Sequence, residues 1–231
     1  SSSKPVVVNS LEDTATPLEG QTTLRSAIGE VANGGTISFD PALDGETIEL
    51  SIIEEDHTVL KAEVMGFDYV ENISYLIGYM ERDYGKSALY TRKNLEIDAS
   101  GLNEGITLAW TGTDAARVLA VYGNLTLRNV SITGGHSVAE AIDGYDPNAD
   151  PGDSNSQPWT LGRGGALAVW GEARLIDVTL YDNHTEGDFD QSRDRGAFGG
   201  GIYADIVDIT NSVISGNTVV GAGAAGAGVY S

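Results

Sequence analysis

The 231-residue sequence contains no cysteine, which excludes two ways of stabilising a fold. Disulfide bonds and thiolate metal sites both require cysteine, so neither is available to this chain. Long apolar runs are also missing, because no stretch approaches the 18 or so apolar residues of a membrane-spanning helix. We therefore expect no transmembrane segment.

Basic residues are scarce. The chain has 13 Lys and Arg against 34 Asp and Glu, a net charge of −21 at pH 7. A field of that sign repels nucleic acids and anionic lipids, so we expect no nucleic-acid partner. It attracts cations, and this leaves two interpretations: a solvated acidic surface, or acidic loops that coordinate calcium. The 30 glycines are nearly twice the usual share and favour a turn-rich β architecture.

Three segments repeat one pattern, at 118–132, 166–180 and 201–214. Each has two short alternating strands separated by a polar residue, and the intervals between these polar residues are 48 and 34 residues for Asn129, Asp177 and Asn211. Apolar and polar residues alternate with period two, which is typical of strands with one face in a core and one in water. Asn at such a bend tolerates the left-handed backbone region and can bond to the backbone or to the next repeat.

Strands this short bury too few side chains to be stable alone, so successive repeats have to stack. Glycine-rich segments precede each repeat and permit tight turns. We expect residues 93–231 to form stacked coils of a right-handed parallel β-helix, an all-β solenoid whose hand follows the rule for parallel crossovers. Because Val229 and Tyr230 match Ile202 and Tyr203, we also expect the chain to continue into a missing C-terminal part.

Residues 1–50 are expected to form an N-terminal cap and the first coils. The sequence predicts strands at 6–8, 36–39 and 47–50, and a short helix at 22–32 that is capped by Thr22 or Thr23. A helix packed over the first coil would shield the open end of the core.

These N-terminal residues also carry a family resemblance. The order Val-Asn-Ser, Thr-Leu-Arg-Ser-Ala-Ile, Gly-Gly-Thr-Ile-Ser-Phe-Asp and Thr-Ile-Glu-Leu resembles the N-terminal capping module of large bacterial secreted β-helix proteins, which carries a Ser-Leu-Arg-Glu-Ala-type helix. Asn-Leu-Glu-Ile-Asp at 94–98 and the Gly-Gly-Gly-Ile-Tyr segment at 199–203 resemble the repeats of adhesin-like and polymorphic outer-membrane proteins. The resemblance implies a secreted or cell-surface location. We expect a polysaccharide or a surface protein of a host or neighbouring cell as partner.

Residues 51–92 depart from that family pattern as an aromatic-rich insertion. The spacing of Ile73, Leu76, Ile77 and Met80 predicts an amphipathic helix at 72–84. In one interpretation the insertion forms an aromatic platform for sugar rings or a partner protein. In the other, the helix packs on the side of the solenoid and buries the same tyrosines, which are Tyr75, Tyr79 and Tyr84.

A second insertion, at 139–163, places oxygen-bearing side chains at nearly alternate positions. Ca²⁺ takes six to eight oxygen ligands, and the candidates are Asp143, Asp146, Asn148, Asp150 and Asp153. The closing glutamate and the helical context of an EF-hand are missing. The two interpretations left are a looser calcium loop and an acidic loop that binds nothing.

A third loop, at 186–196, adds the carboxylates Glu186, Asp188, Asp190 and Asp194. A glycoside hydrolase needs two carboxylates at a defined separation, and a polysaccharide lyase needs a base near a metal or an arginine. The candidate bases are His136, His184 and Tyr181; the three histidines of the chain show no metal-ligand spacing. We expect a protein for adhesion, surface display or carbohydrate binding, with a polysaccharide lyase or glycoside hydrolase, calcium-assisted or not, as the alternative.

Overall fold

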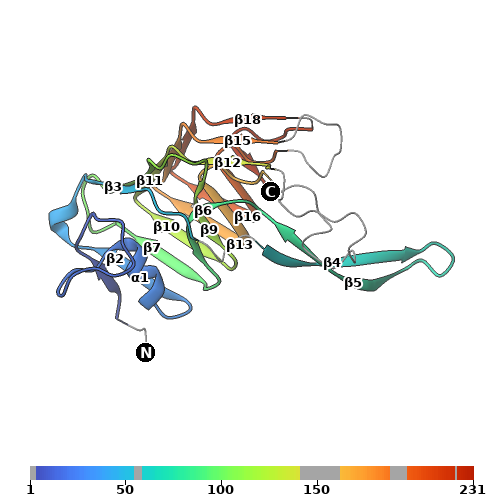
Figure 1. The fold of residues 1–231 in the computed structure, drawn as a ribbon, viewed down its shortest axis with the longest axis horizontal. Helices are drawn as coiled ribbons and strands as arrows, with labels where there is room; N and C mark the ends of the chain where they lie inside the picture. The colour runs from blue at the N-terminus through green and yellow to red at the C-terminus, as the bar shows by residue number, and fades with distance from the viewer. Residues whose placement is uncertain (1–3, 55–58, 141–161, 188–196, 222) are drawn as a thin grey trace.

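The computed structural model describes residues 4–54, 59–140, 162–187, 197–221 and 223–231. Within these ranges the chain is mostly β, and its sheets are parallel except for one antiparallel hairpin (Figure 1). No helix in the described part is both long and apolar enough to cross a membrane.

The largest sheet has nine strands. Its main path runs β1 (Val6–Val8), β2 (Gly35–Phe39), β7 (Leu95–Asp98), β10 (Leu125–Arg128), β13 (Leu167–Ile176), β16 (Ile202–Thr210) and β19 (Val229–Tyr230). Off this path, β9 (Arg117–Val121) pairs with β13 and with β6 (Ser87–Thr91). The strands that the sequence predicted at 6–8 and 36–39 are β1 and β2, and the segment at 94–98 that resembles a family repeat contains β7.

Two smaller parallel sheets accompany it. The five-stranded sheet has the order β17 (Val213–Ser215), β14 (Thr179–Tyr181), β11 (Val130–Thr133), β8 (Ile106–Trp110) and β3 (Thr47–Leu50). The three-stranded sheet has the order β12 (His136–Val138), β15 (His184–Glu186) and β18 (Thr218–Val220). The chain visits the three sheets in the same order three times, as β10–β11–β12, β13–β14–β15 and β16–β17–β18. We call each of these visits a pass.

The passes lie in register at the intervals that the sequence predicted. Leu127 pairs with Leu175, 48 residues on, and Leu175 with Ile209, 34 residues on. Polar Thr126 pairs with Arg174 beside them, so one side of each strand stays apolar and the other polar. A one-residue slip would turn every apolar side chain outward, and the alternation therefore fixes the pairing.

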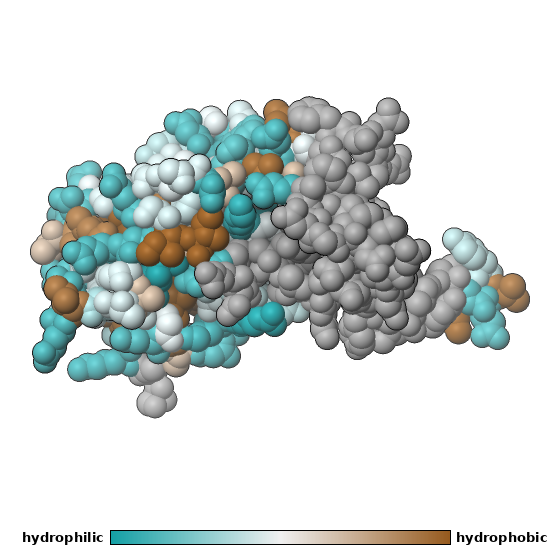
Figure 2. Space-filling model, in the orientation of Figure 1, coloured by the Kyte–Doolittle hydropathy of each residue, from teal (hydrophilic) through white to brown (hydrophobic). Residues whose placement is uncertain are grey.

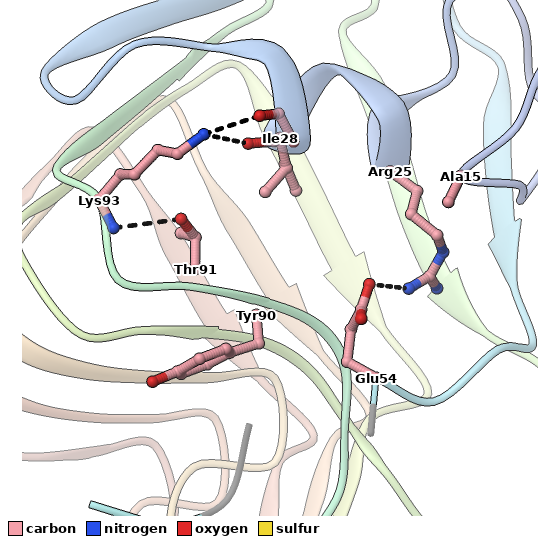
Figure 3. Close-up of a pocket in the computed structure, with 8 residues that line it drawn as sticks. Ala15, Arg25, Ile28, Glu54, Tyr90, Thr91 and Lys93 are labelled. Atoms are coloured by element: carbon pink, nitrogen blue, oxygen red, sulfur yellow. Dashed lines mark hydrogen bonds and ion pairs between the residues drawn. The ribbon is translucent and has the colours of Figure 1, made fainter. Parts of the chain in front are cut away.

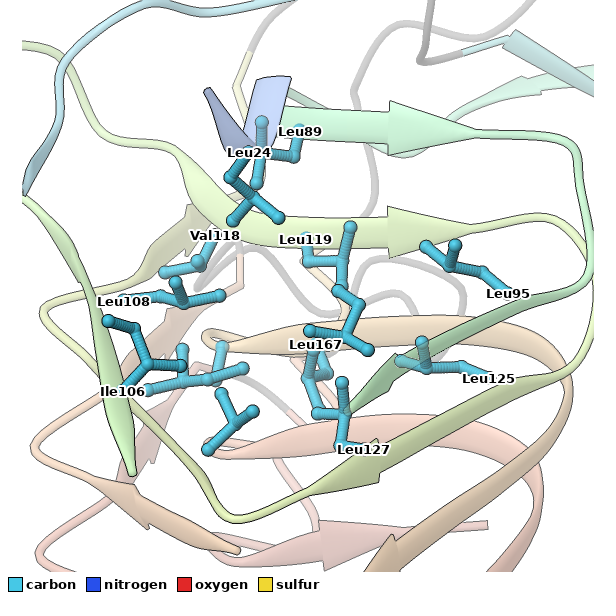
Figure 4. Close-up of a cluster of buried hydrophobic side chains, with 14 of the residues drawn as sticks. Leu24, Leu89, Leu95, Ile106, Leu108, Val118, Leu119, Leu125, Leu127 and Leu167 are labelled. Carbon is cyan, nitrogen blue, oxygen red and sulfur yellow. The ribbon is translucent and has the colours of Figure 1, made fainter. Parts of the chain in front are cut away.

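The core lies between the sheets and is built from side chains of successive passes (Figure 4). Leu125, Leu127 and Leu175 are buried, as are Val130 and Ile132 of the second sheet. Each fully buried side chain of this size stabilises the fold by about 1.5–3 kcal/mol relative to an exposed one.

The polar residues at the bends have the backbone conformation expected of them. Asn129, Asp177 and Asn211 have φ values of 56°, 54° and 46°. The left-handed region costs a non-glycine residue about 1–2 kcal/mol, and side-chain hydrogen bonds offset this cost. Asn129 Nδ2 donates to the carbonyl oxygens of Ala99 and Leu102 at 3.1 and 2.9 Å, and Asn211 Nδ2 donates to Asp177 Oδ1.

A short helix, α1 (Leu24–Glu30), covers the N-terminal part of the core and confirms the predicted helix. Of the two predicted caps Thr23 is correct: it forms a capping box with Ser26. At the carboxyl end of α1, Lys93 Nζ donates hydrogen bonds to three carbonyl oxygens at 2.7–3.0 Å. These carbonyl groups would otherwise lack a partner within the helix. A 3-10 turn, η1 (Pro41–Leu43), follows β2, and β3 matches the strand predicted at 47–50.

The helix predicted at 72–84 is wrong. These residues form β5 (Ile73–Asp83), which pairs antiparallel with β4 (Val59–Asp68) in a hairpin that projects from the body (Figure 1). The hairpin register runs from Val59 opposite Asp83 to Asp68 opposite Ile73. Pairing with a partner strand decides the conformation here, since the same residues also carry an alternation of period two.

Candidate functional site

The three-stranded sheet places two histidines side by side. His136 on β12 and His184 on β15 are register partners, and their ring centroids lie 4.8 Å apart at an interplanar angle of 61°. The His136 N–H donates to the carbonyl oxygen of Ala116 at 2.8 Å, and the His184 N–H donates to that of Gly135 at 2.9 Å. Backbone hydrogen bonds on both strands therefore fix where the two imidazoles leave the sheet.

A carboxylate joins the two rings. Glu186 follows His184 by two residues on β15, so both side chains are on the same face of the strand. Glu186 Oε2 lies 3.5 Å from His136 Nε2 and 3.8 Å from His184 Nε2. The three side chains are 38%, 30% and 38% exposed for His136, His184 and Glu186 respectively. We call these three residues the His–His–Glu group.

The environment favours the neutral form of His184. Burial lowers the pKa of His184, and the neighbouring His136 lowers it further, while the Glu186 carboxylate acts in the opposite direction. His184 Nδ1 forms a hydrogen bond with Thr218 Oγ1, and Thr218 is its register partner on β18. The ring is therefore held by Nδ1 and directs Nε2 towards Glu186.

The nitrogen of His136 in this group has no conventional partner. Its Nε2 atom is shielded from solvent and forms no hydrogen bond with any residue that the structure describes. The 3.5 Å distance to Glu186 Oε2 is longer than an ordinary hydrogen bond. Each of the three residues offers one ligand atom, and these atoms lie within 4.8 Å of one another. The group has the composition either of a metal site or of an acid–base site.

Of the three predicted bases, the structure brings two together. His136 and His184 meet in the His–His–Glu group, whereas Tyr181 is the last residue of β14 in the five-stranded sheet and pairs in register with Thr133. No described hydrogen bond or ion pair joins the Tyr181 side chain to the group. Glu186 had been predicted only as part of an acidic loop. The two histidines are separated by the 48-residue interval between passes. They therefore lack the short spacing by which metal ligands are found in a sequence, and their proximity was not predicted.

The predicted aromatic platform is described only in part. Tyr75 and Tyr79 lie on β5, and their side chains are outside the described residues. The half-buried ring of Tyr84 packs edge-on against Trp170, with centroids 4.7 Å apart. Its backbone oxygen accepts a hydrogen bond from Arg117 at 2.8 Å.

A second set of rings lies near Tyr84. The guanidinium of Arg163 lies 4.3 Å from the ring centre of Phe198 and 5.6 Å from that of Tyr203, and Tyr203 stacks on Tyr230 at 5.7 Å. Burial raises the pKa of Tyr203, and the positive charge of Arg163 opposes that rise. These rings and the cation support one another in the fold, and Tyr84 contributes to that packing.

A cavity of about 400 Å³ lies beside α1 (Figure 3). Two cations and a carboxylate line it: Arg25, Lys93 and Glu54. Arg25 forms ion pairs with Asp13 and Glu54 at 2.7 and 2.8 Å, and Lys93 donates a hydrogen bond to a carbonyl oxygen at the carboxyl end of α1. The charges of this cavity therefore hold the N-terminal cap to the rest of the fold.

The remaining predicted residues lie outside the described part of the chain. These are the calcium candidates Asp143, Asp146, Asn148, Asp150 and Asp153, together with Asp188, Asp190 and Asp194 of the third loop. The calcium loop stays a prediction. No protein-family model, curated protein or solved structure matches the chain.

Proposed function

We propose that the chain is a right-handed parallel β-helix of a secreted or cell-surface protein that serves in adhesion, surface display or carbohydrate binding. Three passes through the same three parallel sheets, in register, support the β-helix. Connections between parallel strands of one sheet are right-handed in almost all proteins, so the proposed coil is right-handed. The net charge of −21 disfavours nucleic acid as a partner and suits a protein exposed to solvent and salt.

One observation carries the binding function: the tip of the β4–β5 hairpin exposes a group of large apolar side chains (Figure 2). Tyr69 is 88% exposed, Val70 94% and Ile73 49%. Three such residues lie within five positions at the far end of a projecting hairpin, and apolar residues gathered in this way mark an interaction site in soluble proteins more often than scattered single residues do.

The turn that presents these residues is well ordered by its own hydrogen bonds. Asp68 Oδ1 accepts from the backbone N–H groups of Val70 and Glu71 at 2.8 and 3.1 Å. Asn72 closes the turn in the left-handed region, with φ of 55°. A turn that is fixed before binding loses less conformational entropy when it meets its partner.

The chemistry of the tip fits two kinds of extracellular surface. The ring of Tyr69 offers a face on which a sugar ring stacks, as the predicted aromatic platform would. Val70 and Ile73 offer aliphatic surface for a partner protein, and burial of such surface contributes about 25 cal/mol per Å². The neighbouring carboxylates Asp68 and Glu71 favour a partner with basic groups around its apolar contact.

The experiment compares binding by the wild-type chain and by a Tyr69→Ser, Val70→Ser, Ile73→Ser triple variant. Both are applied to an immobilised panel of neutral and anionic polysaccharides and to intact host or neighbouring cells. We expect the affinity of the triple variant to be at least about tenfold lower for whichever surface the wild type binds. Leu18→Ser is the control, because Leu18 is 73% exposed but lies outside the hairpin. An unchanged affinity of the triple variant contradicts the proposal.

The alternative function is a polysaccharide lyase or glycoside hydrolase, and the His–His–Glu group favours it. An enzyme of this kind needs a base near a carboxylate, and a neutral His184 beside Glu186 meets that need. Release of new chain ends from the same polysaccharide panel, with and without calcium, tests it. Turnover by the wild type that is lost in His184→Gln and retained in the hairpin variant would establish the enzyme in place of the binding protein.

A further inference from the structure

We propose that His136, His184 and Glu186 form a site for a divalent transition metal of the zinc class. This inference does not depend on the hairpin. It rests on the convergence of two imidazole nitrogens and one carboxylate oxygen from two strands of the three-stranded sheet.

The ligand atoms are already close to the positions that such a metal requires. In a tetrahedral zinc site the metal–ligand bonds are about 2.0–2.1 Å, which places neighbouring ligand atoms about 3.3–3.4 Å apart. Glu186 Oε2 lies 3.5 Å from one histidine nitrogen and 3.8 Å from the other. Shifts of a few tenths of an ångström bring the carboxylate to bonding geometry with each imidazole. The two imidazole nitrogens, which lie within 4.8 Å of each other, have to approach further by rotation of their side chains.

The lone nitrogen of His136 is a second and independent sign of a ligand. A shielded polar atom without a hydrogen bond is unfavourable, and such atoms are rare in folded proteins. His136 Nε2 is such an atom among the described residues, and it is directed towards Glu186. A metal ion between the three side chains would give this nitrogen the partner that it lacks.

The scaffold and the surroundings support coordination. Ser137, which follows His136 on β12, and Thr185, which lies between His184 and Glu186 on β15, are buried, so the strands that carry the ligands are anchored from their other face. Thr218 Oγ1 holds Nδ1 of His184 and leaves Nε2 to the metal.

The donor set selects the class of metal. Two imidazoles and a carboxylate suit Zn²⁺ and Co²⁺, whereas Ca²⁺ takes oxygen ligands almost exclusively. Three protein ligands leave a fourth position for water or for an oxygen of a bound partner. The site is therefore distinct from the calcium loop predicted at 139–163.

The test measures metal binding by the whole chain after dialysis against a chelator. Zn²⁺ is titrated by calorimetry in millimolar Ca²⁺, which occupies weak acidic sites, and Co²⁺ is followed by its visible absorption, which reports nitrogen ligands and tetrahedral geometry. We expect one Zn²⁺ per chain and an intense Co²⁺ spectrum.

Three ligand variants, a variant of Thr218 and a control decide whether the proposed residues are the ligands. His136→Gln, His184→Gln and Glu186→Gln should each weaken Zn²⁺ binding by more than tenfold and abolish the Co²⁺ spectrum. Thr218→Val should weaken binding by about tenfold or more, as loss of a group that orients a metal ligand usually does. His57→Gln removes the third histidine of the chain and should leave the affinity unchanged.

Melting curves in chelator establish that each variant is folded before its affinity is compared. If the wild type binds no Zn²⁺ in Ca²⁺, the proposal is overturned. It is also overturned if several ions bind and the ligand variants bind them as the wild type does, since acidic surface groups then account for the binding. Because the readout is the metal alone, a failure of the hairpin to bind its partner leaves this result unaffected.

Discussion

His136 and His184 are 48 residues apart in the chain and face each other in register on adjacent parallel strands, with their rings 4.8 Å apart. The same interval relates Leu127 to Leu175 in the core and Asn129 to Asp177 at the bend. The interval that stacks the core therefore also builds the His–His–Glu group. In a fold of this kind, a polar residue that recurs at the repeat interval has its partner one pass away.

Asn183 should be among the polar residues most important for stability. It is buried, its Nδ2 donates to Ile132 and Asn217, and its Oδ1 accepts from the Gly135 N–H. Asn183→Ala leaves buried backbone groups unsatisfied, at about 1–3 kcal/mol for each. We expect thermal and denaturant unfolding to show a loss of that order, whereas the exposed Asn103→Ala stays within about 0.5 kcal/mol of the wild type. Equal effects of the two substitutions would argue against the described network.

The buried ion pair of Arg25 should outweigh the exposed pair of Arg174. Arg25 Nε lies 2.7 Å from Asp13, and both side chains are almost fully buried. Arg25→Met leaves the Asp13 carboxylate buried without its cation, which costs about 3–5 kcal/mol. Arg174→Met removes a half-exposed pair with Glu172 at 2.9 Å and should cost no more than about 1 kcal/mol. Denaturant titrations of both variants give the comparison, and a smaller loss in Arg25→Met than in Arg174→Met would contradict it.

Much of the strand pattern was predictable from the sequence because it depends on local alternation. Leu125 and Leu127 alternate with polar neighbours, and Asn129 marks the bend that separates two sheets. Thr23 and Ser26 form the helix cap that their spacing permits. These features are determined by residues within a few positions of one another.

The hairpin was not predicted because the helical spacing was preferred to a local strand signal, and the His–His–Glu group was not predicted because its histidines are 48 residues apart. Ile73, Tyr75, Ile77 and Tyr79 place β-branched or aromatic residues at every second position, and Gly78 disfavours a helix; this signal was missed beside the helical spacing. The signal for the pairing of His136 with His184 is the 48-residue interval, applied to polar residues as well as to apolar ones.

Gly135 should tolerate no side chain. A Cβ at this position would lie 2.0 Å from the backbone oxygen of Gly165, on the neighbouring pass. Gly135→Ala therefore forces the passes apart beside His136, at a cost of about 1–3 kcal/mol. Gly29 in α1 has open space around the same position, so Gly29→Ala should be neutral or should stabilise by up to about 1 kcal/mol. Melting temperatures that fall alike in the two variants would be inconsistent with the close approach at Gly135.

The ionisation of Tyr203 should be displaced to high pH. Burial raises its pKa above the ordinary value of 10, so the folded chain holds this proton longer than the unfolded chain does. Stability therefore falls as pH rises above 10, and Tyr203→Phe should remove that part of the fall. The difference in tyrosinate absorbance between wild type and variant isolates one phenol. Its midpoint should lie above pH 10, and a midpoint at or below 10 would contradict the buried position of the ring.

The register of successive passes underlies the core, the bends and the His–His–Glu group, and one cross-linking measurement tests it directly. The chain has no cysteine, so a Thr126→Cys, Arg174→Cys variant carries only the two introduced thiols. Their Cα atoms are register partners, within the reach of a disulfide. In a Thr126→Cys, Ile176→Cys control the second thiol is displaced by two residues, to a Cα separation of about 8 Å, beyond that reach. Mild oxidation followed by thiol titration should show both thiols lost in the first variant and both retained in the second. Cross-linking of the second variant but not of the first would show that the passes are not stacked at the 48-residue interval.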